Sequence, residues 1–227
     1  MLPQNYEIQP FDMKNIPLML DVVVPMWSPP LEEMSFRRFY VEHIIRNNYF
    51  ENEYHYQLVE KAVGAGEAAG FHDKLSNEVS DELRDTSTIG EFCAMAFFAR
   101  KNDICKADDW FNLESKKYPQ NLQRSMQKGK LYIELMDEKT RAFMKNDDIQ
   151  LSLYISRKKG CGSMLLNELC NQLRAQGWKK LYLWTDCECD WQWYTDHGYE
   201  LVSKDVYEPF TEQDGEDYLT YIFRKTL

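Results

Sequence analysis

A run of basic residues followed by two glycines is the part of the sequence best suited to chemistry. It reads Arg157-Lys158-Lys159-Gly160-Cys161-Gly162-Ser163 and joins an expected strand at 149–155 to an expected helix at 163–174. Glycines allow a sharp turn and let a ligand approach the backbone closely. The start of a helix offers unpaired N–H groups and a partial positive charge, which attract anions. The run therefore predicts a pyrophosphate site, although its spacing is not that of a Walker A loop.

A tyrosine further along the chain is suited to donate a proton. Tyr194 lies in the segment Trp193-Tyr194-Thr195-Asp196-His197-Gly198-Tyr199-Glu200-Leu201, after a strand expected at 180–185. A phenol has a pKa of about 10 and keeps its proton at neutral pH, whereas a free thiol has a pKa of about 8.5. Carboxylates are candidates for the opposite role of base, and the sequence does not choose among Asp186, Glu188, Glu91 and Glu134.

These two elements, in this order, resemble the GNAT superfamily of acyl-CoA-dependent N-acetyltransferases. The family's loop has Gln or Arg, two variable residues, Gly, one variable residue, and Gly or Ala, and Arg157 to Gly162 match it. The Trp193–Leu201 segment resembles the family's Phe-Tyr-x-x-x-Gly-Phe element. In place of the Asn and Ala that many members carry before this tyrosine, the chain has Cys187 and Asp190.

The resemblance implies a fold, a donor and a set of roles. The fold would be α/β (α+β): a mixed, mostly antiparallel twisted sheet flanked by helices, with a V-shaped cleft for coenzyme A between two central strands. Acetyl-CoA would be the acyl donor, and no metal would take part. The loop from Arg157 to Ser163 would hold the pyrophosphate. A backbone N–H near Leu153, Tyr154 and Ile155 would polarise the thioester oxygen. Tyr194 would protonate the departing sulfur or donate a hydrogen bond to it.

Composition limits the other possibilities. The chain has 227 residues, of which 44% are hydrophobic, and fits a single domain over 1–227. Its net charge of −10 argues against nucleic-acid binding, which needs a basic surface. We find no apolar run of membrane-spanning length and no signal peptide, so a cytoplasmic protein with six reduced cysteines is expected. The oligomeric state stays open.

Hydrophobic periodicity predicts the remaining elements. Strands are expected at 6–11, 54–60, 92–98, 199–204 and 218–224. Helices are expected at 12–24, where Pro25 should end the first one, at 32–48 and at 119–144, with a short helical turn at 191–197. The coenzyme A core would cover about 149–204. The helical segments 25–50 and 107–145 and the insert 62–89 carry no motif that assigns them a role.

Two other functions compete with acyl transfer. Glycines in the stretch 63–70 could form a dinucleotide-phosphate loop of an NADP-dependent oxidoreductase, but the preceding strand alternates polar and apolar residues, unlike a buried parallel strand. Alternatively, the fold could be a non-catalytic coenzyme A-binding or interaction module, with the acidic stretch 205–217 facing a partner or forming a solvated loop. The acceptor amine of an enzyme could equally be a small molecule, a peptide N-terminus or a lysine.

Overall fold

The computed structural model describes residues 2–28, 32–61, 90–211 and 215–227. The insert 62–89, with the glycine stretch 63–70 considered above as a dinucleotide site, lies outside the described residues.

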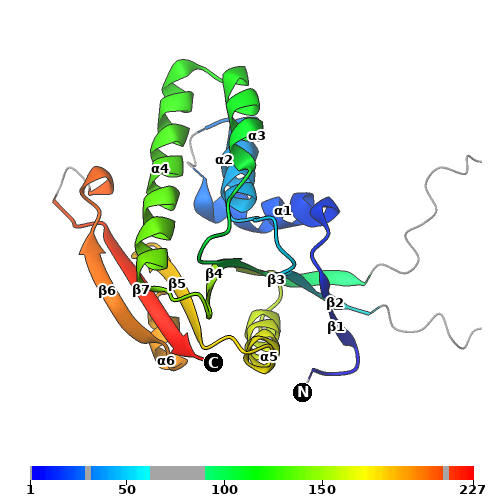
Figure 1. Cartoon of the computed structure of the whole chain (residues 1–227). Helices are drawn as coiled ribbons and strands as arrows, with labels where there is room; N and C mark the ends of the chain where they lie inside the picture. The colour runs from blue at the N-terminus through cyan, green and yellow to red at the C-terminus, as the bar shows by residue number, and fades with distance from the viewer. Residues whose placement is uncertain (1, 29–31, 62–89, 212–214) are drawn as a thin grey trace, which may run out of the picture.

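A seven-stranded sheet forms the centre of the molecule (Figure 1). Within the described chain, neighbouring strands are antiparallel except β4 and β5, which are parallel. The expected mixed, mostly antiparallel sheet flanked by helices is therefore confirmed. In spatial order the strands are β1 (Tyr6–Pro10), β2 (His55–Glu60), β3 (Glu91–Arg100), β4 (Asp148–Ser156), β5 (Lys180–Asp186), β7 (Leu219–Thr226) and β6 (Glu200–Val206).

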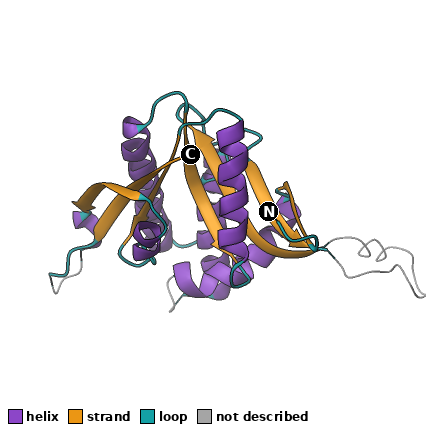
Figure 2. Cartoon of the chain, turned by 90° about the horizontal axis from the view of Figure 1, so that it is seen from below, coloured by secondary structure: helices purple, strands orange, loops and turns teal. Residues whose placement is uncertain are grey.

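Helices cover both faces of this sheet. One face carries α5 (Cys161–Ala175), which lies in front of the strands when the molecule is seen from below (Figure 2). The opposite face carries α1 (Ile16–Trp27) and α2 (Met34–Asn47), which pack on β3 and β4. The long helix α4 (Gln120–Phe143) packs on β5 and β7. Shorter elements are α3 (Ala107–Glu114), α6 (Gln192–Asp196) and 3-10 turns at Met13–Asn15, Ser115–Lys117 and Glu208–Phe210.

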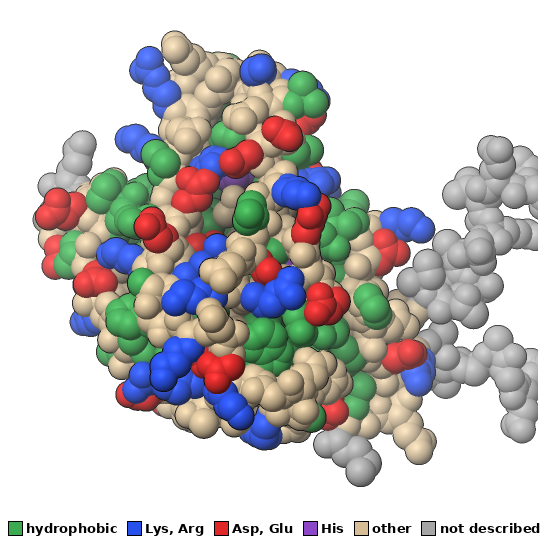
Figure 3. All heavy atoms as spheres, in the orientation of Figure 1, with side chains coloured by type: hydrophobic (Ala, Val, Ile, Leu, Met, Phe, Trp, Pro, Cys, Tyr) green, Lys and Arg blue, Asp and Glu red, His purple; other side chains and the backbone are tan. Residues whose placement is uncertain are grey.

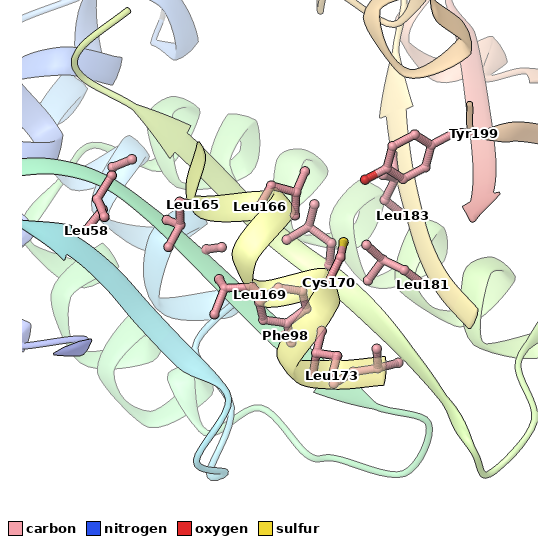
Figure 4. Close-up of a cluster of buried hydrophobic side chains, with 14 of the residues drawn as sticks. Leu58, Phe98, Leu165, Leu166, Leu169, Cys170, Leu173, Leu181, Leu183 and Tyr199 are labelled. Atoms are coloured by element: carbon pink, nitrogen blue, oxygen red, sulfur yellow. The ribbon is translucent and has the colours of Figure 1, made fainter. Parts of the chain in front are cut away.

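The apolar stripe of α5 fixes this helix against the sheet. Its side chains point at residues of β2, β3 and β5 (Figure 4), and the stripe consists of Leu165, Leu166, Leu169, Cys170 and Leu173. The helix ends in a Schellman motif, because Gly177 has φ +97° and the Trp178 N–H donates to the Leu173 carbonyl over 3.1 Å. The start of α5 is thereby held at the end of β4, where the anion loop was expected.

Pro25 does not end the first helix, contrary to the sequence expectation. It lies inside α1, which continues to Trp27. A proline in the last turn removes only one N–H donor, so the helix tolerates it there. The expected helical segment 107–145 resolves into α3, a 3-10 turn and α4.

The face of the molecule shown in Figure 3 carries charge of both signs. Acidic and basic side chains are interspersed across it. Within the described residues, no helix has both the length and the apolarity needed to cross a bilayer.

Candidate active site

The central feature of the site is the separation of β4 from β5. The two strands pair only from Asp148 to Gln150 on β4 and from Lys180 to Tyr182 on β5. Beyond that point β4 stays paired with β3 and β5 stays paired with β7, so the sheet opens into two wings (Figure 1). A cavity of about 760 Å³ fills the opening, with Leu151 to Tyr154 on one wall and Leu183 to Asp186 on the other.

A β-bulge lies in β4 at the point of separation. Phe97 of β3 is opposite Leu153 and Phe98 is opposite Leu151, so Ser152 is an extra residue in β4. Leu151 packs with α5, whereas Leu153 and Ile155 pack with α1 and α2, although all three have the same parity in the sequence. Odd-numbered side chains before the bulge thus point to one face of the sheet, and those after it point to the other. The Ser152 hydroxyl donates to the Asn48 carbonyl of α2 over 3.0 Å, which holds the bulge in place.

The glycine loop joins this strand to α5 in the expected way. Gly160 adopts φ +82° with open space around its Cα, a conformation that favours glycine. The N–H groups of Arg157 and Lys158 both donate to the Cys93 carbonyl, which ties the loop to β3. A Cβ on Gly162 would collide with the Tyr154 hydroxyl and with Ser156. Tyr154 also lines the cavity, so this side chain connects the cavity to the loop.

Backbone N–H groups of the loop divide into two sets. The Cys161 N–H donates to the Lys158 carbonyl, and the Gly162 N–H donates to the Ser156 hydroxyl over 3.0 Å. The N–H groups of Lys159, Gly160 and Ser163 have no hydrogen-bond partner within the part of the chain that the structure describes. These last three are the donors available to an anion.

The three cations of the loop also differ from one another. The Lys158 ammonium lies 2.7 Å from Glu60 and 2.6 Å from Glu91, and these two carboxylates raise its pKa. Arg157 lies 3.7 Å from Glu91 and so also faces the end of β3. Lys159 is exposed and makes no ion pair with any described residue. Lys159 is therefore the cation of this loop that can turn to a bound phosphate without breaking an ion pair.

Tyr194 of α6 lies at the cavity, as do Leu153 and Tyr154 of β4. Its ring packs against Tyr199 at 5.3 Å and against Phe223 at 5.6 Å between centroids. Burial raises the pKa of Tyr194 above the usual phenol value, with smaller contributions from neighbouring groups that include Tyr154. The side chain is therefore a protonated hydrogen-bond donor at neutral pH. Ile155 and the residues from Arg157 to Ser163 are not among those that line the cavity.

The structure separates the four candidate bases. Asp186 and Glu188 line the cavity. Glu91 instead pairs with Lys158 at the far end of β3, and Glu134 pairs with Lys130 on α4. The Asp186 carboxylate accepts a hydrogen bond from the Tyr132 hydroxyl over 3.2 Å. Of the four candidates, Asp186 and Glu188 are thus the ones placed to meet an acceptor, and Asp190, which the sequence analysis did not consider, also lines the cavity.

Sequence reasoning missed most of the aromatic wall of this cavity. It includes Trp27, Tyr40, Tyr132, Trp184, Phe210 and Tyr218, contributed by α1, α2, α4, β5 and the β6–β7 connection. The described part of the stretch 205–217 therefore reaches the site through Phe210. In the sequence these residues are indistinguishable from core aromatics.

Within the described ranges, no group of three or more His, Cys, Asp or Glu side chains is placed to hold a metal ion.

Comparison with known proteins gives likeness of structure alone. No protein-family model matches the chain, and no curated protein matches it by sequence. The C-terminal condensation domain of Ebony, solved in complex with beta-alanyl-dopamine, is similar over 100% of both chains, with a TM-score of 0.54 and 9% identity. This likeness shows a shared fold.

Named N-acetyltransferases also match, at lower structural similarity. The ribosomal-protein-S18-alanine N-acetyltransferase from Escherichia coli matches with a TM-score of 0.47 and 11% identity, over 97% of this chain and 93% of that one. The Drosophila melanogaster polyamine N-acetyltransferase matches with a TM-score of 0.46 and 11% identity, over 98% of this chain and 100% of that one. Because these TM-scores are below 0.5, the assignment of the fold rests on the Ebony domain.

Proposed function

We propose that this protein is an N-acetyltransferase that transfers the acetyl group of acetyl-CoA to a primary amine by direct attack of the amine. The observation that carries the proposal is the opening between β4 and β5, with the glycine loop at the end of one strand and Tyr194 across the cavity. Acetyl-CoA would supply the acyl group in activated form, as a thioester.

Unpaired backbone groups of β4 would hold the donor. Beyond Gln150 no described residue pairs with this strand on the β5 side, so its N–H and C=O groups on that side could bind an extended amide-bearing arm. A backbone N–H from Leu153, Tyr154 or Ile155 would donate to the thioester oxygen, where negative charge develops during attack. The N–H groups of Lys159, Gly160 and Ser163, with the Lys159 ammonium, would hold the pyrophosphate.

Tyr194 would act as a hydrogen-bond donor to the sulfur. An ordinary phenol is already a weaker acid than a thiol by about 1.5 pKa units, or about 2 kcal/mol. Burial weakens the acidity of Tyr194 further. Complete proton transfer to the sulfur is therefore uphill, whereas a hydrogen bond that strengthens as charge develops lowers the barrier without that cost.

Asp186 or Glu188 would accept the proton of the attacking amine. Both carboxylates line the cavity, and an ammonium ion must lose a proton before its nitrogen can attack. The remaining candidates, Glu91 and Glu134, are engaged elsewhere by Lys158 and Lys130.

The identity of the donor is the point to test first. The solved structure that shares this fold is named a condensation domain and not an acetyltransferase. Acetyl-CoA at 100 times its Kd should stabilise the protein by about 2.7 kcal/mol and raise its Tm by several degrees, whereas NADPH should not. Release of free thiol in the presence of amines would then show transfer. Stabilisation without transfer to any amine would support the non-catalytic module, and no stabilisation by acetyl-CoA would exclude the proposal.

A further inference from the structure

The lining of the cavity carries charge of one sign only. Asp186, Glu188 and Asp190 line it, and no lysine, arginine or histidine does so within the described residues. A ligand with a carboxylate or phosphate would meet no positive partner beyond the donor loop. A cationic ligand gains from these carboxylates before any other contact is made.

The negative charge is confined to one short segment of the wall. All three carboxylates come from residues 186–190, at the end of β5. Glu188 lies close enough to Tyr40 and Tyr218 to contribute, after burial, to their raised pKa values. The walls from α1, α2 and α4 are apolar or aromatic, and Asn48 Oδ1, just after α2, is a buried neutral acceptor with no hydrogen-bond partner among the described residues. The cavity therefore offers one acidic segment, 186–190, for a cationic head and uncharged walls for the rest of the ligand.

Aromatic rings surround the space next to the carboxylates. Tyr132 of α4 contacts Phe210 at 5.0 Å and Tyr218 at 5.9 Å, and Phe210 contacts Tyr218 at 5.3 Å between centroids. These contacts bridge α4 and the β6–β7 connection, so the three rings form one continuous aromatic wall of the cavity. Rings in this arrangement stack with an aromatic ligand and attract a cation through their faces.

We infer that the acceptor is a small arylalkylamine: one primary ammonium group for Asp186 and Glu188, and one aromatic ring for the wall of Tyr132, Phe210 and Tyr218. This inference rests on the proposed function and narrows its acceptor. A diamine long enough to reach past residues 186–190 would leave its second charge against an uncharged wall, and an amino acid would bring a carboxylate to an acidic cavity.

A matched set of amines tests the inference on the intact protein. Phenethylamine is compared with phenylalanine, which adds a carboxylate, with 1,4-diaminobutane, which replaces the ring by a second ammonium, and with a short peptide that has a free N-terminus. With acetyl-CoA present, kcat/KM for phenethylamine should exceed that of each of the others at least tenfold. A preference for the diamine or the peptide would overturn the inference and leave the proposed acetyl transfer standing.

Binding measured by calorimetry separates this result from a failure of catalysis. Phenethylamine should bind at least tenfold more tightly than 1,4-diaminobutane and phenylalanine even if no acetyl transfer occurs. Asp186→Asn and Glu188→Gln should each weaken phenethylamine binding at least fivefold. Asp147→Asn, an exposed carboxylate in the turn before β4, should not change it. Absence of binding at millimolar phenethylamine would contradict the inference. So would binding by the Asp186→Asn and Glu188→Gln variants that is as tight as binding by the wild type.

Discussion

Gln150, the last residue of β4 that pairs with β5, donates its side-chain amide to the Asp137 carboxylate of α4 over 2.7 Å. The same carboxylate oxygen accepts from the Trp184 indole of β5 over 2.8 Å. Trp184 follows Tyr182, the last residue of β5 that pairs with β4, by two positions, and it lines the cavity. One buried carboxylate therefore joins both strands to α4 at the point where they separate.

Removal of this carboxylate should destabilise the fold. Asp137→Ala leaves the Gln150 and Trp184 donors without a partner, and we expect a loss of about 2–4 kcal/mol in the free energy of unfolding, measured by urea denaturation. Asp137→Asn keeps an acceptor oxygen and should lose less. Equal stability of the alanine variant and the wild type would show that the two strands do not depend on this contact.

The Asp137→Asn variant also tests how the protonation of Asp137 makes stability depend on pH. Burial raises the pKa of Asp137, so the folded state binds this proton more tightly than the unfolded state does. The contribution of Asp137 to stability is then greatest in acid and falls as the pH rises through the raised pKa. Asparagine cannot titrate. The free energy of unfolding of the variant should therefore rise relative to that of the wild type from pH 4 to pH 8. An unchanged difference would refute the raised pKa.

Gly162 should not tolerate a side chain. In Gly162→Ala the new Cβ overlaps the Tyr154 hydroxyl and approaches Ser156, so β4 and α5 must move apart. We expect a loss of about 1–3 kcal/mol in stability and weaker binding of acetyl-CoA. Adding Tyr154→Phe removes one of the clashing atoms and should recover part of both losses. A double variant no better than Gly162→Ala would place the damage elsewhere.

Lys159 and Lys158 form a matched pair of cations with different expected effects. Lys159→Gln should weaken acetyl-CoA binding about two- to fivefold at low salt, because an exposed charge contact contributes up to about 1 kcal/mol. Lys158→Gln should change this affinity less, because its ammonium is held by Glu60 and Glu91. Titrations at several salt concentrations measure both effects. A larger effect at Lys158 would show that its ion pairs break on binding.

Tyr194→Phe should separate binding from turnover. The variant keeps the ring that packs on Tyr199 and Phe223 and should retain its affinity for acetyl-CoA. Loss of a hydrogen bond to a developing charge should lower kcat about 10- to 100-fold. Because the pKa of Tyr194 is raised, the wild-type rate should show no fall below pH 10 from ionisation of this phenol. An unchanged kcat in the variant would remove Tyr194 from the mechanism.

His43 should make the fold sensitive to acid. It is 2% exposed, neither ring nitrogen has a hydrogen-bond partner among the described residues, and its ring lies 4.5 Å from that of Phe111. Burial, with the Lys130 charge, lowers the pKa of His43 to about 4. Above the pKa of an unfolded histidine, about 6.5, the ring is neutral in both the folded and the unfolded state. As the pH falls below that value the unfolded state binds the proton first, which lowers the free energy of unfolding by about 2 kcal/mol at pH 5. His43→Phe should reduce the loss of stability between pH 7.5 and pH 5 in urea denaturation; an equal loss would contradict this account.

Local pattern was sufficient to predict most elements and the order of the motifs. Strand, loop, helix and tyrosine turn were expected within a few residues of their bounds, because alternation, glycine positions and the apolar stripe of α5 are properties of nearby residues. The sequence did not reveal the bulge at Ser152, since Ile149 to Ile155 alternates without interruption. Nor did it show that Lys158 is held by two carboxylates whereas Lys159 has no ion pair with a described residue, because Glu60 and Glu91 come near Lys158 only through the pairing of β2, β3 and β4.

Because of the β-bulge at Ser152, the number of residues in β4 determines which side chains face each side of the sheet. Deleting one residue between Gln150 and Leu153 would remove the half-turn, so the side chains that follow would exchange faces of the sheet. Tyr154 would leave the α5 side, where it lies against Gly162, and Leu153 would leave the α1 and α2 core. A substitution in β4 therefore changes one side chain of the site. An insertion or deletion at the bulge would instead disrupt the core under α1 and α2, the cavity wall and the contact of Tyr154 with Gly162 together.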